Sequence, residues 1–410
     1  MKLVNWITKA RAYMAILSVI ALLNACATTS GGGYVVGPRD DAGKQITGTP
    51  KTIPSTQLSV LIPVFDPNIP DNSDDYKEKG IWPELRRAEA NRFSVQLRDA
   101  IADTAAFGAV RVSPDNTATA HLYVHGKIIK SNGEDISISV SVTDISGKRL
   151  LKKTYKHRVR EYALNDPRNL GADIYIPVFA KAANDIAKLS KRLKSNKIAQ
   201  LNGIEEMRFA ESFSPDYFSQ YIKSSRSGKT KLLGFPSDDD SMLQRVRALR
   251  VRDQMFIDNI QIDYDGFRNK MNADYMLWQR QAYTESKAAR KAAAEASAKM
   301  FIGILSVATA ASLASDSNYR SSAYNDGVVG LAVAGVATIA SGVQDSKQAK
   351  AHRESLSEMG RSLNIQLAPK VMEMEDRTVE LTGTASEQYS TWREFLHEIY
   401  ETEKTPNILL

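Results

Sequence analysis

The pattern of apolar and polar residues predicts a mixed α and β unit from about Gln57 to Lys194. An apolar run of strand length lies at Leu58–Phe65. Apolar residues then recur at helical spacing over 85–105, and again over 173–193. We expect these two helices to cover one face of a small sheet, which gives a two-layer α+β arrangement.

Three further strands are predicted between residues 120 and 159, because apolar and polar side chains alternate there. Turns at Asn132–Gly133 and Ser146–Gly147 separate them. The apolar face needs a helical cover, and the other face, which carries His121 and His125, is predicted to be solvated. The predicted sheet is therefore mixed or antiparallel, with one wet side.

From Asp238 onward a 3.6-residue period dominates, and its apolar stripe continues to Ala311 with Asp253 as one of its few interruptions. A single helix of about 70 residues would be roughly 100 Å long. A second helical stretch at Val328–Leu367 follows the polar turn Ser315–Asp326. The pattern predicts a long antiparallel helical hairpin.

The tip of this hairpin, residues 300–343, is uncharged over two stretches of about 15 residues each. One interpretation is a hairpin that inserts into a membrane as a pore or anchor, where small residues permit close helix contacts. Each stretch would cover only about 22 Å of a hydrocarbon core of about 30 Å. The alternative, favoured by the Ser and Thr residues in both stretches, is a tip buried against a protein partner or a second copy of the chain. The glycines that would make these contacts are Gly303, Gly327, Gly330, Gly335 and Gly342.

Two shorter segments complete the helical pattern. Aromatic residues at helical spacing over 204–221 predict a connector, and a break at Thr382–Gly383–Thr384 introduces an amphipathic helix at the C-terminal end. We expect that last helix to pack on the base of the hairpin. The predicted organisation has six parts: 1–25, 26–56, 57–200 (the α+β domain), 201–237 (the connector), 238–375 (the hairpin) and 376–410 (the C-terminal helix and tail).

The first 25 residues have the pattern of an export signal. Lys2, Lys9 and Arg11 precede an uncharged, mostly apolar stretch, Ala12–Leu23, which is shorter than the roughly 20 residues that a permanent membrane helix needs. The run Leu23-Asn24-Ala25-Cys26 follows, and Cys26 is the only cysteine in the chain.

This run resembles the lipobox of bacterial lipoprotein precursors. The resemblance implies that Cys26 is acylated, becomes the new N-terminus and anchors the protein to a membrane, with this covalent lipid as its only cofactor. Ala27 in the next position implies the outer membrane rather than the inner one. Residues 26–56, rich in Thr, Ser, Gly and Pro, would be a flexible tether.

The predicted α+β unit has a second resemblance. The phrases Val60–Phe65 and Val142–Lys148, in the order strand, helix, short strand and antiparallel strands, are similar to the small domain of curli-export-type outer-membrane lipoproteins. The N-terminal domain of the translocation protein TolB has the same order. The similarity covers residues 57–194 and implies a role in an envelope export or surface-structure machine.

The net charge and the motifs of the chain argue against a nucleic-acid partner, a nucleotide-binding site and a metal site. Loss of three basic residues with the signal lowers the formal charge from +7 to +4, too small a surplus to predict a nucleic-acid partner. Gly228-Lys229-Thr230 ends like a phosphate-binding loop, but Lys223 stands where such a loop requires glycine. His121 and His125 have no acidic or cysteine neighbour to complete a metal site. No catalytic, cofactor-binding or metal-binding residues are predicted.

Together these patterns predict a non-enzymatic outer-membrane lipoprotein that faces the periplasm. It would act as a scaffold for an envelope export or surface-structure machine, contacting protein partners or a second copy of itself through the hairpin. The alternatives are a pore subunit whose hairpin enters the membrane, and an envelope hydrolase, for which the sequence offers no arranged nucleophile, base or metal site.

Overall fold

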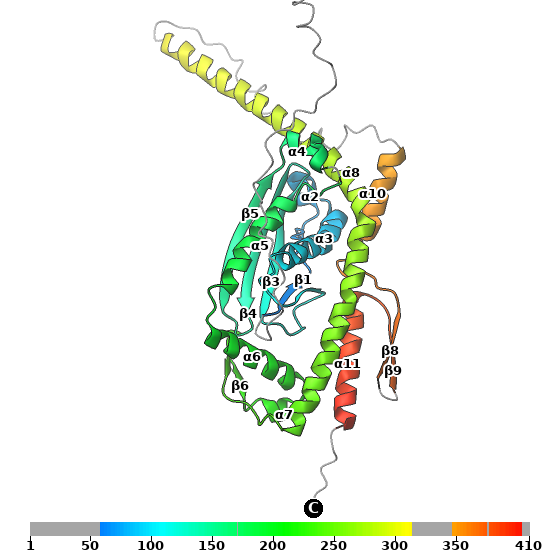
Figure 1. Ribbon diagram of the computed structural model, residues 1–410. Coiled ribbons are helices and arrows are strands. Elements are labelled where there is room, and N and C mark those ends of the chain that lie inside the picture. The colour runs from blue at the N-terminus through cyan, green and yellow to red at the C-terminus, as the bar shows by residue number, and fades with distance from the viewer. Residues whose placement is uncertain (1–57, 170, 314–346, 375–376, 404–410) are drawn as a thin grey trace, which may run out of the picture.

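The computed structural model describes residues 58–169, 171–313, 347–374 and 377–403 (Figure 1). The predicted signal, Cys26 and the tether lie outside these ranges, as does the part of the hairpin tip that holds Gly327, Gly330, Gly335 and Gly342. The described chain has the predicted α+β architecture, with a mixed sheet, covering helices, a very long helix and a helix near the C-terminal end.

A five-stranded sheet forms the first layer, in the order β2-β1-β3-β4-β5. Strand β1, between β2 and β3, runs parallel to both of these neighbours, whereas β3, β4 and β5 are antiparallel to one another in turn. Pro63 is the last residue of β1, where its missing N–H costs the ladder least. The strands are β1 (Val60–Pro63), β2 (Val110–Ser113), β3 (Leu122–Ser131), β4 (Asp135–Asp144) and β5 (Arg149–Arg158).

The alternation that predicted the sheet also determines which face is buried. In β4, Ile136, Ile138, Val140 and Val142 are at most 1% exposed, and serines alternate with them on the opposite face. The two predicted covering helices are confirmed as α3 (Pro83–Ala102) and α5 (Ile176–Ser190). The rings of Phe93 in α3 and Phe179 in α5 lie 5.3 Å apart over this apolar face. Shorter helices α2 (Asp74–Lys79) and α4 (Glu161–Asn165), and the 3-10 turn η2 (Pro167–Asn169), lie in the connections.

The opposite face of the sheet is only partly exposed to solvent. The connector forms α6 (Ser195–Phe213) and α7 (Pro215–Phe218), followed by the small ribbon β6 (Ile222–Ser224) and β7 (Thr230–Leu232). Glu205 of α6 comes within 4.0 Å of the His121 ring, and His121 is only 8% exposed. The prediction that His121 lies on a solvated face is therefore wrong, because α6 covers the start of β3. Lys127, farther along β3, is exposed as predicted.

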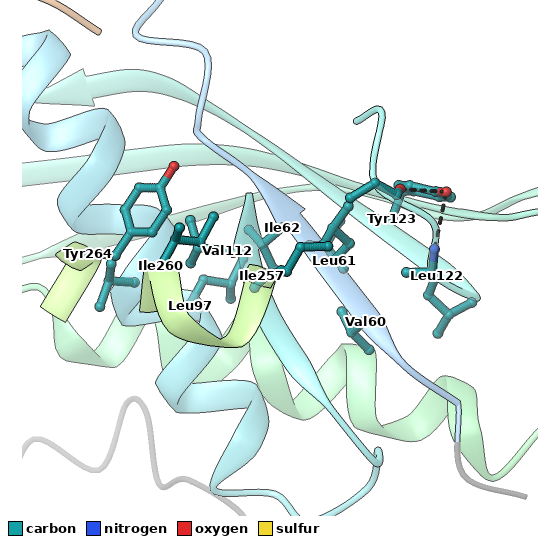
Figure 2. Close-up of a cluster of buried hydrophobic side chains, with 14 of the residues drawn as sticks. Val60, Leu61, Ile62, Leu97, Val112, Leu122, Tyr123, Ile257, Ile260 and Tyr264 are labelled. Carbon is teal, nitrogen blue, oxygen red and sulfur yellow. Dashed lines mark hydrogen bonds between the residues drawn. The ribbon is translucent and has the colours of Figure 1, made fainter. Parts of the chain in front are cut away.

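The long helix is α8 (Ser241–Leu313), and it runs through Gly266 without a break. It begins where Asp240 accepts a hydrogen bond from the Leu243 backbone N–H at 2.9 Å, so the Asp240 side chain caps the helix. The first half of α8 packs on α3 and on the β2 edge of the sheet. Figure 2 shows this contact, with Ile257, Ile260 and Tyr264 of α8 beside Leu97, Val112 and Ile62.

The return helix ends earlier than predicted. In the described residues it is α10 (Lys347–Met359), which packs on α8 and α3, and residues 360–374 do not continue it. The reason lies at Gly360, where a Cβ would stand 1.8 Å from the Glu84 carbonyl oxygen; the backbone touches α3 there and turns away. A β-hairpin that was not predicted follows, β8 (Lys370–Met374) with β9 (Arg377–Leu381).

The last helix, α11 (Ala385–Glu403), packs on the base of α8, which confirms its predicted place. Phe256 of α8 stacks between Trp392 and Tyr389 of α11, at 5.4 and 6.0 Å between ring centroids. One continuous hydrophobic core thus joins the sheet, α3, α5, α6, the first half of α8 and α11. The first half of α8 is an internal element of this body, and Figure 1 shows its far end extending beyond it.

Candidate functional site

A cluster of polar side chains is buried where α8 crosses α3 and the start of α5. We call it the buried junction; each member is at most 7% exposed. Its residues are Glu89 and Arg92 of α3, Asp173 and Tyr175 before α5, and Tyr275 and Gln279 of α8.

Arg92 is the centre of the buried junction. Its guanidinium donates to Asp173 Oδ2 from Nε at 3.1 Å and from Nη2 at 2.9 Å, and Nη2 also donates to Asn272 of α8 at 2.9 Å. The guanidinium carbon lies 4.5 Å from the centre of the Tyr275 ring, a cation–π contact. Gln279 donates to the other oxygen of Asp173 at 2.8 Å. One buried ion pair therefore connects α3, the segment before α5, and α8.

Glu89 occupies the inner end of the buried junction. Its Oε1 accepts hydrogen bonds from the Tyr275 hydroxyl at 2.8 Å and from the Ser131 hydroxyl at 2.5 Å. Its Oε2 is 3.8 Å from Arg86 Nε and has no hydrogen-bond partner in the described part of the chain. Burial raises the pKa of Glu89, and the charge of Arg86 opposes this shift.

A cavity of about 280 Å³ lies outside the buried junction, between α8, α10 and the start of α3. Trp278 in its wall packs against Tyr275, with ring centroids 5.3 Å apart and a tilt of 31° between the rings, so the wall is continuous with the buried junction. Burial raises the pKa of Glu285, and Arg353 opposes this shift. Indole faces beside opposite charges would accept a small group with apolar and polar parts. The lining residues are Trp82, Trp278, Gln281, Ala282, Glu285 and Arg353.

A second polar cluster lies under α6. His121 Nδ1 is 2.8 Å from the Ser59 hydroxyl and accepts the Ser59 backbone N–H at 2.9 Å. Glu205 forms an ion pair with Arg250 of α8. Burial, followed by the charge of Arg250, lowers the pKa of His121 to about 4, and burial raises the pKa of Glu205 to about 7. Because the backbone N–H already uses the Nδ1 lone pair, this histidine is poorly placed to take a proton from Ser59, and the cluster fits a role in joining α6 to α8.

Two further polar contacts hold helices to α8. His352 of α10 lies 2.6 Å from Asp274, and Ser355 donates to the same carboxylate at 2.5 Å. At the base, Arg393 of α11 lies 3.6 Å from Asp253, which is 2% exposed. The interruption of the apolar stripe at Asp253 therefore marks the buried partner of α11.

The predicted site residues lie elsewhere. Cys26 and four of the five glycines are outside the described residues, and Gly303 lies within α8. Gly303 is not a member of the buried junction, which was not predicted. Its only sequence signal is Gln279, a polar residue close to the apolar stripe of α8, and nothing in the sequence links that position to Arg92.

In the described ranges, no group of three or more His, Cys, Asp or Glu side chains could hold a metal ion. Those ranges also contain no helix with the length and apolarity needed to cross a membrane. No protein-family model matches the chain, and comparison with curated proteins and with solved structures finds no similar protein.

Proposed function

We propose that this protein is a non-enzymatic scaffold of the bacterial outer membrane. A lipid on Cys26 would anchor it facing the periplasm, and α8 with the segment after it would contact components of an envelope export or surface-structure machine. The anchor rests on the export signal and the lipobox-like run before Cys26.

The observation that supports the scaffold role is that the first half of α8 is fixed to the body at several points. At 73 residues it is about 110 Å long, and buried side chains recur on it from Leu243 to Tyr283. The buried junction, α10 and α11 each fix this half to the body through buried or charged contacts. A helix held in this way keeps its far end in a set direction, which is what a scaffold needs in order to present a binding segment.

The lipid anchor is tested by replacing Cys26 with alanine. Wild-type protein should incorporate labelled palmitate and sediment with outer-membrane fractions, whereas Cys26→Ala should lose the label and leave those fractions. Unchanged membrane association of an unlabelled variant would contradict the anchor.

The scaffold role is tested by photo-crosslinking in living cells. A photoreactive residue is placed at Ala292, exposed on α8 beyond the body, and, as a matched control, at Thr154, exposed on β5. We expect discrete adducts with other envelope proteins from position 292 and none from 154. Equal patterns from the two sites, or none from either, would count against the proposal.

A Ser317→Cys variant distinguishes the scaffold from the alternative in which residues 300–343 insert into the membrane. Ser317 lies outside the described residues. A membrane-impermeant maleimide should label Ser317→Cys only after the outer membrane is opened. Labelling of intact cells, with the first domain protected from external protease, would favour a spanning hairpin instead.

A further inference from the structure

The solvent face of α8 is uncharged over a long distance. Exposed positions recur every three or four residues from Val251 to Leu277, and we call these eight positions the outer stripe. Only two of them are polar, Asn259 and Asn269. In a chain that is 25% charged, the solvent face of a helix normally carries charges, so this one is unusual. The six apolar or glycine residues of the outer stripe are Val251, Met255, Ile262, Gly266, Ala273 and Leu277.

Several charged residues of α8 in this region lie beside the outer stripe and form ion pairs with the body. Asp263 pairs with Lys370 of β8 at 2.6 Å, and Asp265 pairs with Arg98 of α3 at 2.6 Å. Ile262, at 72%, is the most exposed large apolar side chain of the described residues. A second helix could therefore cover the outer stripe without taking an unpaired charge out of water.

We infer that the outer stripe binds the outer stripe of a second copy, with the two α8 helices antiparallel and the two-fold axis beside position 264. The stripe is symmetric about position 264, because its positions fall into four pairs that are equally far before and after it: 251 with 277, 255 with 273, 259 with 269, and 262 with 266. The inference deepens the proposed scaffold, and rests on it only in treating α8 as the element that makes contacts between proteins.

The outer pairs of opposed positions are apolar on both sides. Val251 would meet Leu277, and Met255 would meet Ala273. Val251, Met255 and Leu277 are 57%, 59% and 40% exposed, so each of these contacts would remove apolar surface from water. The long, flexible methionine side chain would lie over the small alanine, a combination that fills the space between two helices without a clash.

The inner pairs match in polarity and in size. Asn259 would meet Asn269, and two amides can donate to and accept from each other. Ile262, the largest protrusion, would meet Gly266, where the partner has no side chain. Because this inner pair lies next to the two-fold axis, the glycine lets the two helix axes approach closely at the centre of the contact.

Charge beside the outer stripe follows the same symmetry. Lys270 is exposed, and its opposed position is Asp258, whose side chain stays 55% exposed while pairing with Arg111. A parallel arrangement would instead place Asp258 beside Asp258, and Ile262 beside Ile262. The antiparallel two-fold is thus the arrangement in which the sizes match and Lys270 faces Asp258. Asp263 and Asp265 also oppose each other, and each keeps its ion pair with the body. A two-fold contact of one surface with itself is the commonest kind of protein dimer.

The first test is the mass of the full mature chain in detergent, by analytical ultracentrifugation. We expect a dimer for the wild type and a monomer for Ile262→Lys, which puts two lysines near the axis. The matched control, Ile129→Lys, changes an isoleucine that is 45% exposed on β3 and should leave the dimer intact. A monomeric wild type, or a dimeric Ile262→Lys protein, would overturn the inference.

The second test fixes the register by disulfide formation. A mixture of Asn259→Cys and Asn269→Cys chains should form a mixed cross-linked dimer on mild oxidation. Asn259→Cys alone should not, because the two copies of position 259 would be about 15 Å apart along the axes, beyond the reach of about 7 Å for a disulfide. Self-linking of Asn259→Cys, or no mixed product, would refute the antiparallel register.

The two proposals fail separately in these experiments. The unchanged parent chain, whose only cysteine is Cys26, should form no disulfide because its thiol carries lipid. A parent chain that cross-links would contradict the lipid anchor without affecting the outer stripe. A monomer that still gives photo-adducts from Ala292 would refute the dimer and leave the scaffold standing.

Discussion

Replacing Arg92 with methionine tests whether the buried junction holds α8 to the body. Methionine keeps most of the apolar stem and removes the guanidinium, so packing changes little while Asp173 loses its counter-ion. The side chains of Arg92 and Asp173 are 2% and 5% exposed, so water does not replace the lost partner.

The size of the effect follows from what Asp173 retains. Removing one member of a buried ion pair costs about 3–5 kcal/mol. Asp173 would still accept hydrogen bonds from Gln279 at 2.8 Å and from the Tyr175 backbone N–H at 2.9 Å. We therefore expect Arg92→Met to lower the free energy of unfolding by about 3 kcal/mol, the lower end of that range.

Urea denaturation followed by tryptophan fluorescence measures this loss, because Trp278 packs against the Tyr275 ring that Arg92 covers. The matched control is Arg111→Met, which removes a more exposed ion pair with Asp258 and should cost at most about 1 kcal/mol. Equal losses in the two variants, or a loss below about 1 kcal/mol in Arg92→Met, would refute the view that the junction supports α8.

Three further outcomes are expected. Phe256→Ala removes a fully buried ring from between two aromatic rings of α11 and should lower the free energy of unfolding by about 3–5 kcal/mol, seen as a lower urea midpoint; an unchanged midpoint would contradict the packing. Gly360→Ala should lower Tm and release α10 to proteolysis, because its Cβ would collide with the Glu84 carbonyl oxygen. Burial raises the pKa of Glu205 from 4.5 to about 7, so the free energy of unfolding of the wild type should fall as pH rises between these two values. Glu205→Gln lacks this titration, and its free energy of unfolding should increase relative to that of the wild type by up to about 1.4 kcal/mol per pH unit in this window. A difference between the two proteins that stays constant with pH would show that the carboxyl group does not titrate there.

Local pattern was enough to predict most of the architecture. The serine and β-branched residues of β4 alternate without interruption, and α8 keeps its 3.6-residue period for many turns, so both elements could be placed from sequence. The β8–β9 hairpin could not, because Val371 and Met372 are adjacent apolar residues that break the alternation. The end of α10 at Met359 does have a local signal, because Gly360 directly follows it, but nothing in the sequence reports the contact of Gly360 with α3.

The buried junction could not be predicted, for a different reason. Glu89 and Arg92 are three residues apart, a spacing common for charges on the wet side of a helix. Their partner Tyr275 is 186 positions beyond Glu89, and only the folded chain brings them together. Asp253 shows the opposite case: a charge on an apolar stripe is a visible sign of a buried partner, although the sequence does not identify Arg393 as that partner.

The distant contacts of α10 and α11 also determine when the protein can fold. Arg87 of α3 donates to the carbonyl of Gly360, 273 positions later, and Arg393 reaches back 181 positions to Ser212. Contacts this far apart form slowly, because long stretches of chain must be ordered before the contacts repay the entropy lost. The part of the core that α11 completes also stays open until α11 has been made, so the face of α8 around Phe256 is uncovered while the chain is being synthesised. Chaperones and translocation machinery, which handle unfolded chains, would have that whole interval to engage it.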